Sequence, residues 1–350
     1  MENLSVEQRA AAVTVRRMLY AQLTSRALGV AAQLGIPDLL AGQPLGIREI
    51  SARTGTDTDS LTRLLRSLAV FGVFQERPGQ VFALTPMGEA LTSGHPSSAL
   101  HTALLVSGEF GDAWGQLLET VRTGRSPFER IHATSLFAYL ETEQARTLRA
   151  TFDDSQKYGL VLEVDEILHL VDFSPYHTVI DIGGGEGTFL KRILDRFPDT
   201  TGMIFDLPGS ATLANSQPPE EHLSERCTVV PGNFFEEVPE GGDLYLLSHI
   251  LHDWCDESAV RILQTCRRAM ASQATLMVVD LVAPEDGQAD ERLHTAALMD
   301  LYMLSLFGGT GGQERTAEHV GGLLVKAGFR VAEVHALPSG MHVIRAVPDS

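Results

Sequence analysis

Seven short apolar runs, separated by amphipathic stretches, occupy the second half of this 350-residue chain. Short apolar runs that alternate with helix-like stretches are typical of a mostly parallel sheet with helices on both faces, because such strands are buried on both sides. We therefore expect an α/β, doubly wound domain over residues 171–350. The runs are 178–182, 203–206, 227–230, 244–247, 275–281, 331–334 and 342–346.

A glycine-rich turn follows the first apolar run, in Asp181–Gly187 (DIGGGEG). Glycine lets the backbone approach a ligand because it has no Cβ. The GxGxG spacing matches neither the dinucleotide fingerprint nor a phosphate loop. The second run ends at Asp206, whose carboxylate could accept hydrogen bonds from both ribose hydroxyls of an adenosyl ligand. A turn or helix-cap role for Asp206 is the alternative, and the glycine turn beside it favours the ligand.

A histidine, His252, follows the fourth apolar run. In doubly wound sheets, ligands bind at the carboxyl ends of the strands. Histidine is also the side chain best suited to general-base chemistry near neutral pH. A lone histidine at such a place is often only structural. We expect His249 to pack elsewhere, and Trp254 and Asp256 to begin the next helix.

The first hundred residues predict a helix, a turn, a helix and a small hairpin, which is the order of a winged helix. DNA binding through Arg63 and Arg66 of the second helix is one interpretation. The net charge of −18 favours a solvated face on a packing module instead, because phosphate contacts need basic residues. The expected elements are helices 11–34 and 47–55, a helix capped by Asp57 or Thr58, and strands 73–76 and 80–84.

The intervening segment, 101–170, is expected to be helical and is rich in aromatic residues. Such side chains could line a slot for an aromatic ligand, but they are at least as often plain core. The candidate substrate-binding residues are Trp114, Phe152, Tyr158, Met299 and Met303.

Five motifs together resemble the dimeric, S-adenosylmethionine-dependent small-molecule O-methyltransferases, which include plant caffeic acid methyltransferases and bacterial antibiotic-pathway enzymes. The resemblance covers nearly the whole chain. It implies an N-terminal all-helical, winged-helix-like dimerisation domain (1–100), a helical linker contributing to the substrate pocket (101–170), and a Rossmann-like catalytic domain (171–350). The motifs are Asp181–Gly187, Phe205–Pro208, Gly232–Phe235, Ile250–Trp254 and Gly311–Thr316.

The resemblance also implies residue roles. His252 would be the catalytic base, flanked by Asp280 and Glu314, and many relatives have Glu where this chain has Asp280. Asp206 would hold the ribose, and Asn233, where the family usually has Asp, would border the adenine. The expected S-adenosylmethionine contacts are Asp181, Gly183, Gly185, Asp206, Leu207, Asn233, Phe234 and Ser248.

The expected function is methylation of a hydroxyl on a planar aromatic metabolite. The stretches Ser107–Trp114 and Phe137–Leu140 resemble phenazine methyltransferases, and aromatic polyketides and quinones are the other candidates. Two alternatives remain: a non-methylating enzyme on this scaffold (hydroxylation, decarboxylation or cyclisation), and a ligand-sensing winged-helix regulator.

We expect a homodimer that binds neither nucleic acid, membrane nor metal. The N-terminus does not resemble a signal peptide, and no run of 18 apolar residues occurs. The three cysteines, which lack CxxC spacing, indicate a cytoplasmic protein with reduced thiols.

Overall fold

The computed structural model describes residues 4–216, 223–283, 294–309 and 311–349. These form two compact units. The N-terminal unit comprises residues up to 112 together with 150–159, and the C-terminal unit comprises 113–149 and the residues from 160 onward. The expected boundaries at residues 100 and 170 stay a prediction.

The N-terminal unit contains the expected winged-helix order of elements. The first helix, α1 (Val6–Gln33), begins at a capping box on Ser5, five residues before the start expected from its apolar pattern. Helix α3 (Ile47–Thr54) ends at Gly55 with a φ of 66°, and Asp57 caps α4 (Thr58–Val70) through the amide of Ser60. The remaining helical parts are α2 (Ile36–Ala41), α5 (Pro86–Glu89), α6 (Leu100–Ser107), most of α7 (Glu109–Trp114), and residues 150–159 of α11 (Arg146–Leu170).

A small antiparallel sheet completes this unit, so the expectation of an all-helical N-terminal domain is wrong, whereas the expected hairpin is confirmed. The strands are β1 (Leu45–Gly46), β2 (Phe74–Arg77) and β3 (Val81–Leu84), in the order β1-β3-β2. Phe74 and Phe82 are fully buried beside Leu65 and Leu68 of α4. The aromatic residues of the sheet therefore help to close the core that the helices begin.

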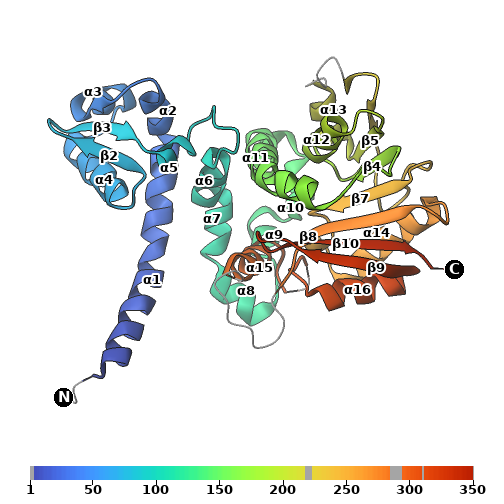
Figure 1. The fold of residues 1–350 in the computed structure, drawn as a ribbon. Coiled ribbons are helices and arrows are strands. Elements are labelled where there is room, and N and C mark those ends of the chain that lie inside the picture. Colours follow the sequence, from blue (N-terminus) through green and yellow to red (C-terminus); the bar gives the residue numbers. More distant parts are fainter. Residues whose placement is uncertain (1–3, 217–222, 284–293, 310, 350) are drawn as a thin grey trace. The chain divides into compact units, whose positions relative to one another are not determined.

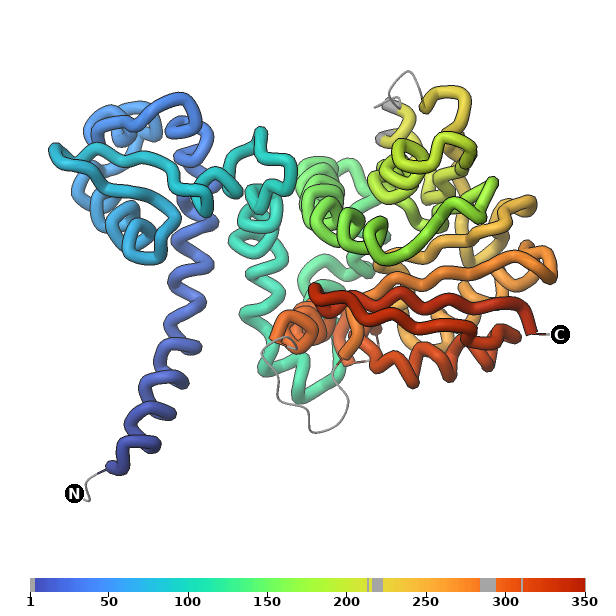
Figure 2. Tube along the Cα trace, viewed as in Figure 1, coloured from blue at the N-terminus to red at the C-terminus, as the bar shows by residue number. Residues whose placement is uncertain are grey.

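The C-terminal unit is built on a seven-stranded sheet, and all seven expected strands are present (Figure 1). The first five strands of this sheet along the chain are parallel, and the last two form an antiparallel hairpin along one edge, whose second strand pairs antiparallel with the fifth (Figure 2). The order is β6-β5-β4-β7-β8-β10-β9. The strands are β4 (Thr178–Ile182), β5 (Thr201–Asp206), β6 (Cys227–Pro231), β7 (Leu244–Ser248), β8 (Thr275–Leu281), β9 (Phe329–Ala336) and β10 (Met341–Pro348).

Both faces of this sheet are covered by helices, as buried parallel strands require. Successive residues of a strand enter opposite cores: Leu246 of β7 packs with α11 and α12 (Thr188–Arg196), whereas Leu247 packs with α14 (Asp256–Ala269) and α16 (Ala317–Lys326). The other helical elements of the unit are α8 (Leu117–Thr123), α9 (Pro127–His132), α10 (Leu136–Leu140), η1 (Glu143–Ala145), α13 (Pro208–Ser216), η3 (Leu251–Asp253) and α15 (His294–Phe307).

The strand order creates one place where a ligand can approach the sheet. Strand β4 is flanked by β5 on one side and by β7 on the other, so the connections leave it in opposite directions. In open α/β sheets, ligands bind at the carboxyl edge of such a switch point. Among the described residues, no helix is long and apolar enough to span a bilayer.

Candidate active site

The glycine-rich turn forms the centre of the switch point. Gly183, Gly185 and Gly187 have φ angles of 71°, 58° and 80°, in the left-handed region that glycine adopts without strain. A Cβ on Gly183 would overlap Cδ1 of Ile250, in the loop after β7. The turn after β4 and the loop after β7 are therefore in direct contact.

The carboxylate of Asp206, at the end of β5, faces this turn. Its Oδ2 accepts a hydrogen bond from the amide of Gly185 (2.8 Å), and its Oδ1 accepts one from the amide of Leu207 (2.6 Å). Burial raises the pKa of Asp206, while these two amides oppose that shift by stabilising the charged form. A carboxylate has about four acceptor sites, so capacity for ligand hydroxyls remains.

Two buried polar atoms lie at the ends of β4 and β7. Oδ2 of Asp181 and Oγ of Ser248 have no hydrogen-bond partner among the described residues. Burial, followed by the charge of Asp206, raises the pKa of Asp181 to about 7. Buried polar atoms are normally satisfied, so these two atoms are suited to a polar ligand at this edge.

The segment after β6 brings the expected adenine neighbours to the same edge. A Cβ on Gly183 would lie 3.7 Å from Cε1 of Phe234, so this ring borders the glycine turn. Oδ1 of Asn233 accepts from the amide of Phe235, and Nδ2 donates to Glu236, each at 3.0 Å. The carboxamide is thus fixed within its own turn, with one lone pair of Oδ1 left for a ligand donor.

His252 lies on η3, immediately beyond the carboxyl end of β7. Its Nδ1 is 3.1 Å from Oε1 of Glu314, and both side chains are almost inaccessible, at 11% and 2% exposure. The amide of Glu314 donates to Oδ1 of Asp300 on α15 (3.0 Å), which holds the glutamate in place. When Nδ1 donates to a carboxylate, Nε2 is left as the proton acceptor.

The carboxylates around His252 raise its pKa by more than burial lowers it. Burial alone would lower the pKa of the imidazole, but Asp253, Glu314 and Asp280 raise it to about 10. Asp253 lies 3.7 Å from Nε2, and burial raises its own pKa to about 6. The surrounding carboxylates therefore stabilise the imidazolium that forms when His252 takes a proton.

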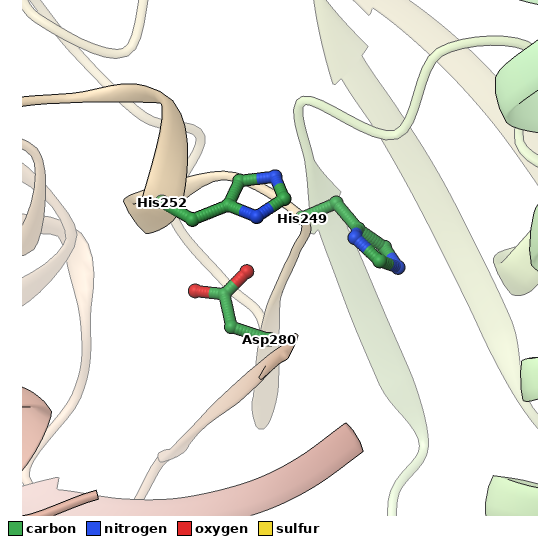
Figure 3. A group of neighbouring side chains, drawn as sticks. All are labelled: His249, His252 and Asp280. Carbon is green, nitrogen blue, oxygen red and sulfur yellow. The ribbon is translucent and has the colours of Figure 1, made fainter. Parts of the chain in front are cut away.

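Asp280 and His249 complete the surroundings of His252. Figure 3 shows the carboxylate of Asp280 directed at the ring of His252, with the ring of His249 beside them. Oδ1 of Asp280 has no hydrogen-bond partner among the described residues, and burial raises its pKa to about 6. Of the three residues expected to catalyse, the structure thus joins His252 directly to Glu314 and places Asp280 alongside.

The expectation that His249 packs elsewhere is wrong. Its ring centroid lies 5.3 Å from that of His252, and its Nε2 is 2.6 Å from Oε2 of Glu163 on α11. Its φ of 55° is uncommon for a residue with a Cβ, which sequence periodicity does not reveal.

Ligand atoms of His249, His252 and Asp280 lie within 4.8 Å of one another, as a metal site would require. One nitrogen of each ring is already bonded to a glutamate, and the pKa of both rings is raised, so protons compete with any metal ion. The three side chains are therefore better suited to acid–base chemistry than to holding a metal ion.

The expected substrate-binding residues divide between the two units. Trp114 packs edge-on against Tyr302 of α15 (5.7 Å between ring centroids), and its Nε1 has no partner among the described residues. On the same helix Met303 is buried and Met299 is 38% exposed. Phe152 and Tyr158 belong to the N-terminal unit, where they pack against Phe110 and His101 respectively.

Sequence reasoning missed several residues that surround His252. Asp253 is one, and Arg315, which binds the carbonyls on both sides of His252, is another. Phe137 stacks on Trp254 (5.8 Å) and on Phe307 (5.9 Å), which extends the aromatic surface toward Phe234. The sequence did offer one indication of the role of Arg315. A charged residue within a glycine-rich motif, outside any helix, has no solvated helix face to occupy and is therefore a candidate for a specific contact.

Comparison with known proteins identifies the family of this chain. The sequence profile of the O-methyltransferase domain matches residues 114–330, and that of the O-methyltransferase dimerisation domain matches residues 17–94. The chain is 65% identical over 333 residues to "O-methyltransferase SfmM3" of Streptomyces lavendulae, covering 95% of this chain and 99% of that protein.

Two solved structures are also similar. The crystal structure of LaPhzM has a TM-score of 0.90 at 37% identity, covering 97% of this chain and 99% of its own. The O-methyltransferase NcsB1 from neocarzinostatin biosynthesis, solved with S-adenosylmethionine and 2-hydroxy-5-methyl naphthoic acid, has a TM-score of 0.78 at 32% identity, covering 93% and 96%.

The protein is therefore an α/β enzyme of the methyltransferase class. It belongs to the O-methyltransferase family and uses S-adenosylmethionine. These comparisons favour O-methylation over the non-methylating and regulatory alternatives.

Proposed function

We propose that this protein methylates a hydroxyl of a planar aromatic secondary metabolite, with His252 as the general base. The observation that carries the proposal is the buried His252–Glu314 pair (3.1 Å), which lies at the carboxyl edge of the sheet beside the glycine turn. Ile250, two residues from the base, contacts that turn. The base and the predicted cofactor site therefore share one edge.

The residues at this edge fit an adenosyl cofactor. Asp206 would accept from the ribose hydroxyls, Phe234 and Asn233 would border the adenine, and Gly183 and Gly185 would lie against the methionine portion. The unpartnered atoms of Asp181 and Ser248 support binding of a polar ligand. Leu207, whose amide binds the carboxylate of Asp206, would lie next to the ribose. When bound, the cofactor supplies a methyl group already activated on a sulfonium.

The task left to the chain is to present a deprotonated oxygen in line with that methyl group. Alignment of two reactants contributes much of the rate in such transfers. A phenol has a pKa near 10. The carboxylates raise the pKa of His252 to about 10 as well, so proton transfer between the two is close to balanced. Glu314 holds Nδ1, leaving Nε2 to take the proton, and the buried charge of Asp280 stabilises the imidazolium.

For the acceptor, we propose a flat aromatic molecule such as a phenazine, with an aromatic polyketide or a quinone as the other candidates. The names of relatives support the class: one of 38% identity is "Phenazine O-methyltransferase PhzM" of Lysobacter antibioticus, and one of 34% is "Mitomycin biosynthesis 6-O-methyltransferase" of Streptomyces lavendulae. Trp114, Met299 and Met303 of the C-terminal unit are the proposed substrate contacts, and the assignment of Phe152 and Tyr158 stays a prediction from the sequence.

We also propose a cytoplasmic homodimer that does not bind nucleic acid. Helix α1 exposes a group of large apolar side chains, which a second copy of the chain would cover. Arg66 of α4 is paired with Glu76 through three hydrogen bonds and is not free for phosphate. Cys227, Cys255 and Cys266 are all free thiols. The exposed apolar side chains of α1 include Met18, Leu19, Tyr20 and Leu23.

A screen of planar phenols with labelled S-adenosylmethionine tests this function. We expect label in the ether product, with one S-adenosylhomocysteine formed per methyl transferred. Formation of S-adenosylhomocysteine without a methylated aromatic product, or product without it, would contradict the proposal. A DNA shift assay at low salt tests the remaining alternative, and we expect no shift.

A further inference from the structure

The segment that carries Glu314 binds the backbone of the base as well as its ring. The amide of Gln313 donates to the carbonyl of His252 (2.7 Å). A Cβ on Gly312 would come to 2.5 Å from that same carbonyl oxygen, so the two chains run in close contact here. Residues 312–315 therefore lie directly against the turn that carries the base.

Arg315 makes the most extensive of these contacts. Its side chain is only 2% exposed. Nη1 donates to the carbonyl of Leu251 (2.8 Å), and Nη2 donates to the carbonyl of Trp254 (2.5 Å). Nε donates to Oδ1 of Asp256 (2.9 Å), at the start of α14. One guanidinium thus holds the residue before the base, the residue two beyond it, and the next helix.

The backbone of Arg315 is also fixed. It pairs with Val282, directly after β8, and its carbonyl accepts from the amide of Ala283 (2.9 Å). The strand that carries Asp280 and the turn that carries His252 are therefore connected through this arginine. Charge-assisted bonds from a planar guanidinium are strong and directional, and lysine cannot reproduce the fork.

Glu314 and Arg315 perform different tasks. The carboxylate of Glu314 contacts the ring of His252, at Nδ1. It does not hold the backbone from which that ring projects. The turn η3 is three residues long and has little structure of its own. Arg315 holds this turn from outside, through the carbonyl of Leu251 within it and that of Trp254 directly after it.

We propose that Arg315 is a positioning residue that sets the direction of the His252 side chain toward the acceptor oxygen. The inference rests on the proposed function, because it requires His252 to be the base. The competing interpretation is that Arg315 only stabilises the fold by joining β8, η3 and α14. A double-mutant cycle separates the two, since a residue that acts through His252 has nothing to act on once that ring is removed.

The experiment compares Arg315→Lys in the wild-type and in the His252→Ala background at the same neutral pH, where transfer depends on the base, and long incubations with labelled S-adenosylmethionine make the slow His252→Ala enzyme measurable. In the wild-type background at neutral pH, we expect kcat to fall about 10- to 100-fold, as misplacement of about 1 Å can cause. S-adenosylmethionine affinity should stay within about twofold, because a bound cofactor is held by other residues. In the His252→Ala background, the substitution should cost less than about threefold.

The pH dependence gives a second readout. The deficit of Arg315→Lys should shrink as pH rises, in parallel with that of His252→Ala, because an ionised acceptor needs no base. A purely structural defect would be independent of pH. Equal losses in the two backgrounds, or a deficit unchanged by pH, would overturn the proposal.

Arg226 provides a matched control. Its Nη1 also donates to three backbone carbonyls, those of Leu194 (3.1 Å), Phe197 (3.4 Å) and Thr200 (3.0 Å), but it contacts none of the residues around His252. Arg226→Lys should lower the melting temperature, and any activity loss should be the same in both backgrounds. If Arg315→Lys does not fold, Asp256→Asn weakens the same clamp more gently and should lose a few-fold in kcat only while His252 is present. An equal loss without His252 would overturn the proposal.

The cycle also separates this inference from the proposed function. If His252→Ala itself keeps wild-type turnover at neutral pH, the base assignment fails. If His252→Ala is impaired and Arg315→Lys is additive with it, only the positioning role fails.

Discussion

Replacing Glu314 by glutamine removes a charge from the base pair while keeping the size of the side chain. Glu314 lies 3.1 Å from Nδ1 of His252, and with both side chains nearly inaccessible the pair is little screened by solvent. A hydrogen bond to a charged group is worth about 1.5–3 kcal/mol. One pKa unit corresponds to about 1.4 kcal/mol, so the pKa of His252 should fall by roughly one to two units.

The sign of the effect on rate follows from the protonation state that reacts. Glu314 stabilises the imidazolium and so helps to raise the pKa of His252 to about 10. Only the neutral imidazole can accept the acceptor's proton, so wild-type kcat/KM should rise with pH through that raised pKa. In Glu314→Gln the rise should occur at lower pH by roughly one to two units. The plateau should also be lower, because the weaker base is a poorer proton acceptor.

The assay is kcat/KM measured by S-adenosylhomocysteine formation across the neutral and alkaline range. Glu318→Gln is the matched control, because Glu318 is an exposed glutamate of α16 in the same segment, and its profile should match the wild type. A Glu314→Gln profile that superimposes on that of the wild type would refute the reasoning, since Glu314 would then not act on the base.

Three further predictions follow from the geometry. Asp206→Ala should weaken S-adenosylmethionine binding by about 10- to 100-fold in calorimetry, because charged hydrogen bonds to the ribose are lost, and unchanged affinity would disprove the ribose assignment. Gly183→Ala should weaken cofactor binding and lower the melting temperature, because its Cβ would overlap Ile250 at a φ of 71°, whereas Gly322→Ala, with open space around it, should do neither. Sedimentation should show a dimer at micromolar concentration that Leu19→Asp weakens, and a fully active wild-type monomer would contradict the assembly.

The sheet could be predicted from the sequence because its strands are buried on both faces. Runs such as 275–281 are continuously apolar apart from Thr275 and Asp280, and every residue of β8 is buried. The glycine turn and Asp206 could also be predicted from the sequence, since a turn at positive φ needs glycine and a carboxylate at the end of a strand has few structural roles. These features depend on neighbours in sequence.

Contacts between residues far apart in the sequence could not be predicted from it. The bonds of His249 to Glu163 and of Arg315 to Leu251 join residues 86 and 64 positions apart, so no local pattern records them. The histidine at 249 was therefore expected to pack elsewhere, and the arginine of the Gly311–Thr316 motif received no role. The all-helical description of the N-terminal domain came from the family resemblance and disagreed with strands 73–76 and 80–84, which the local pattern had predicted. The third strand, β1, was not predicted because its two residues are too few to show alternation.

The turnover of His252→Ala tests the central claim most directly. At neutral pH we expect kcat to fall by about 10² to 10⁴, the usual contribution of a positioned base, while S-adenosylmethionine affinity stays nearly unchanged. The gap to the wild type should narrow as pH rises, because an ionised phenol then needs only alignment. Wild-type turnover by His252→Ala at neutral pH would contradict the account, because the acceptor would then be deprotonated without this histidine.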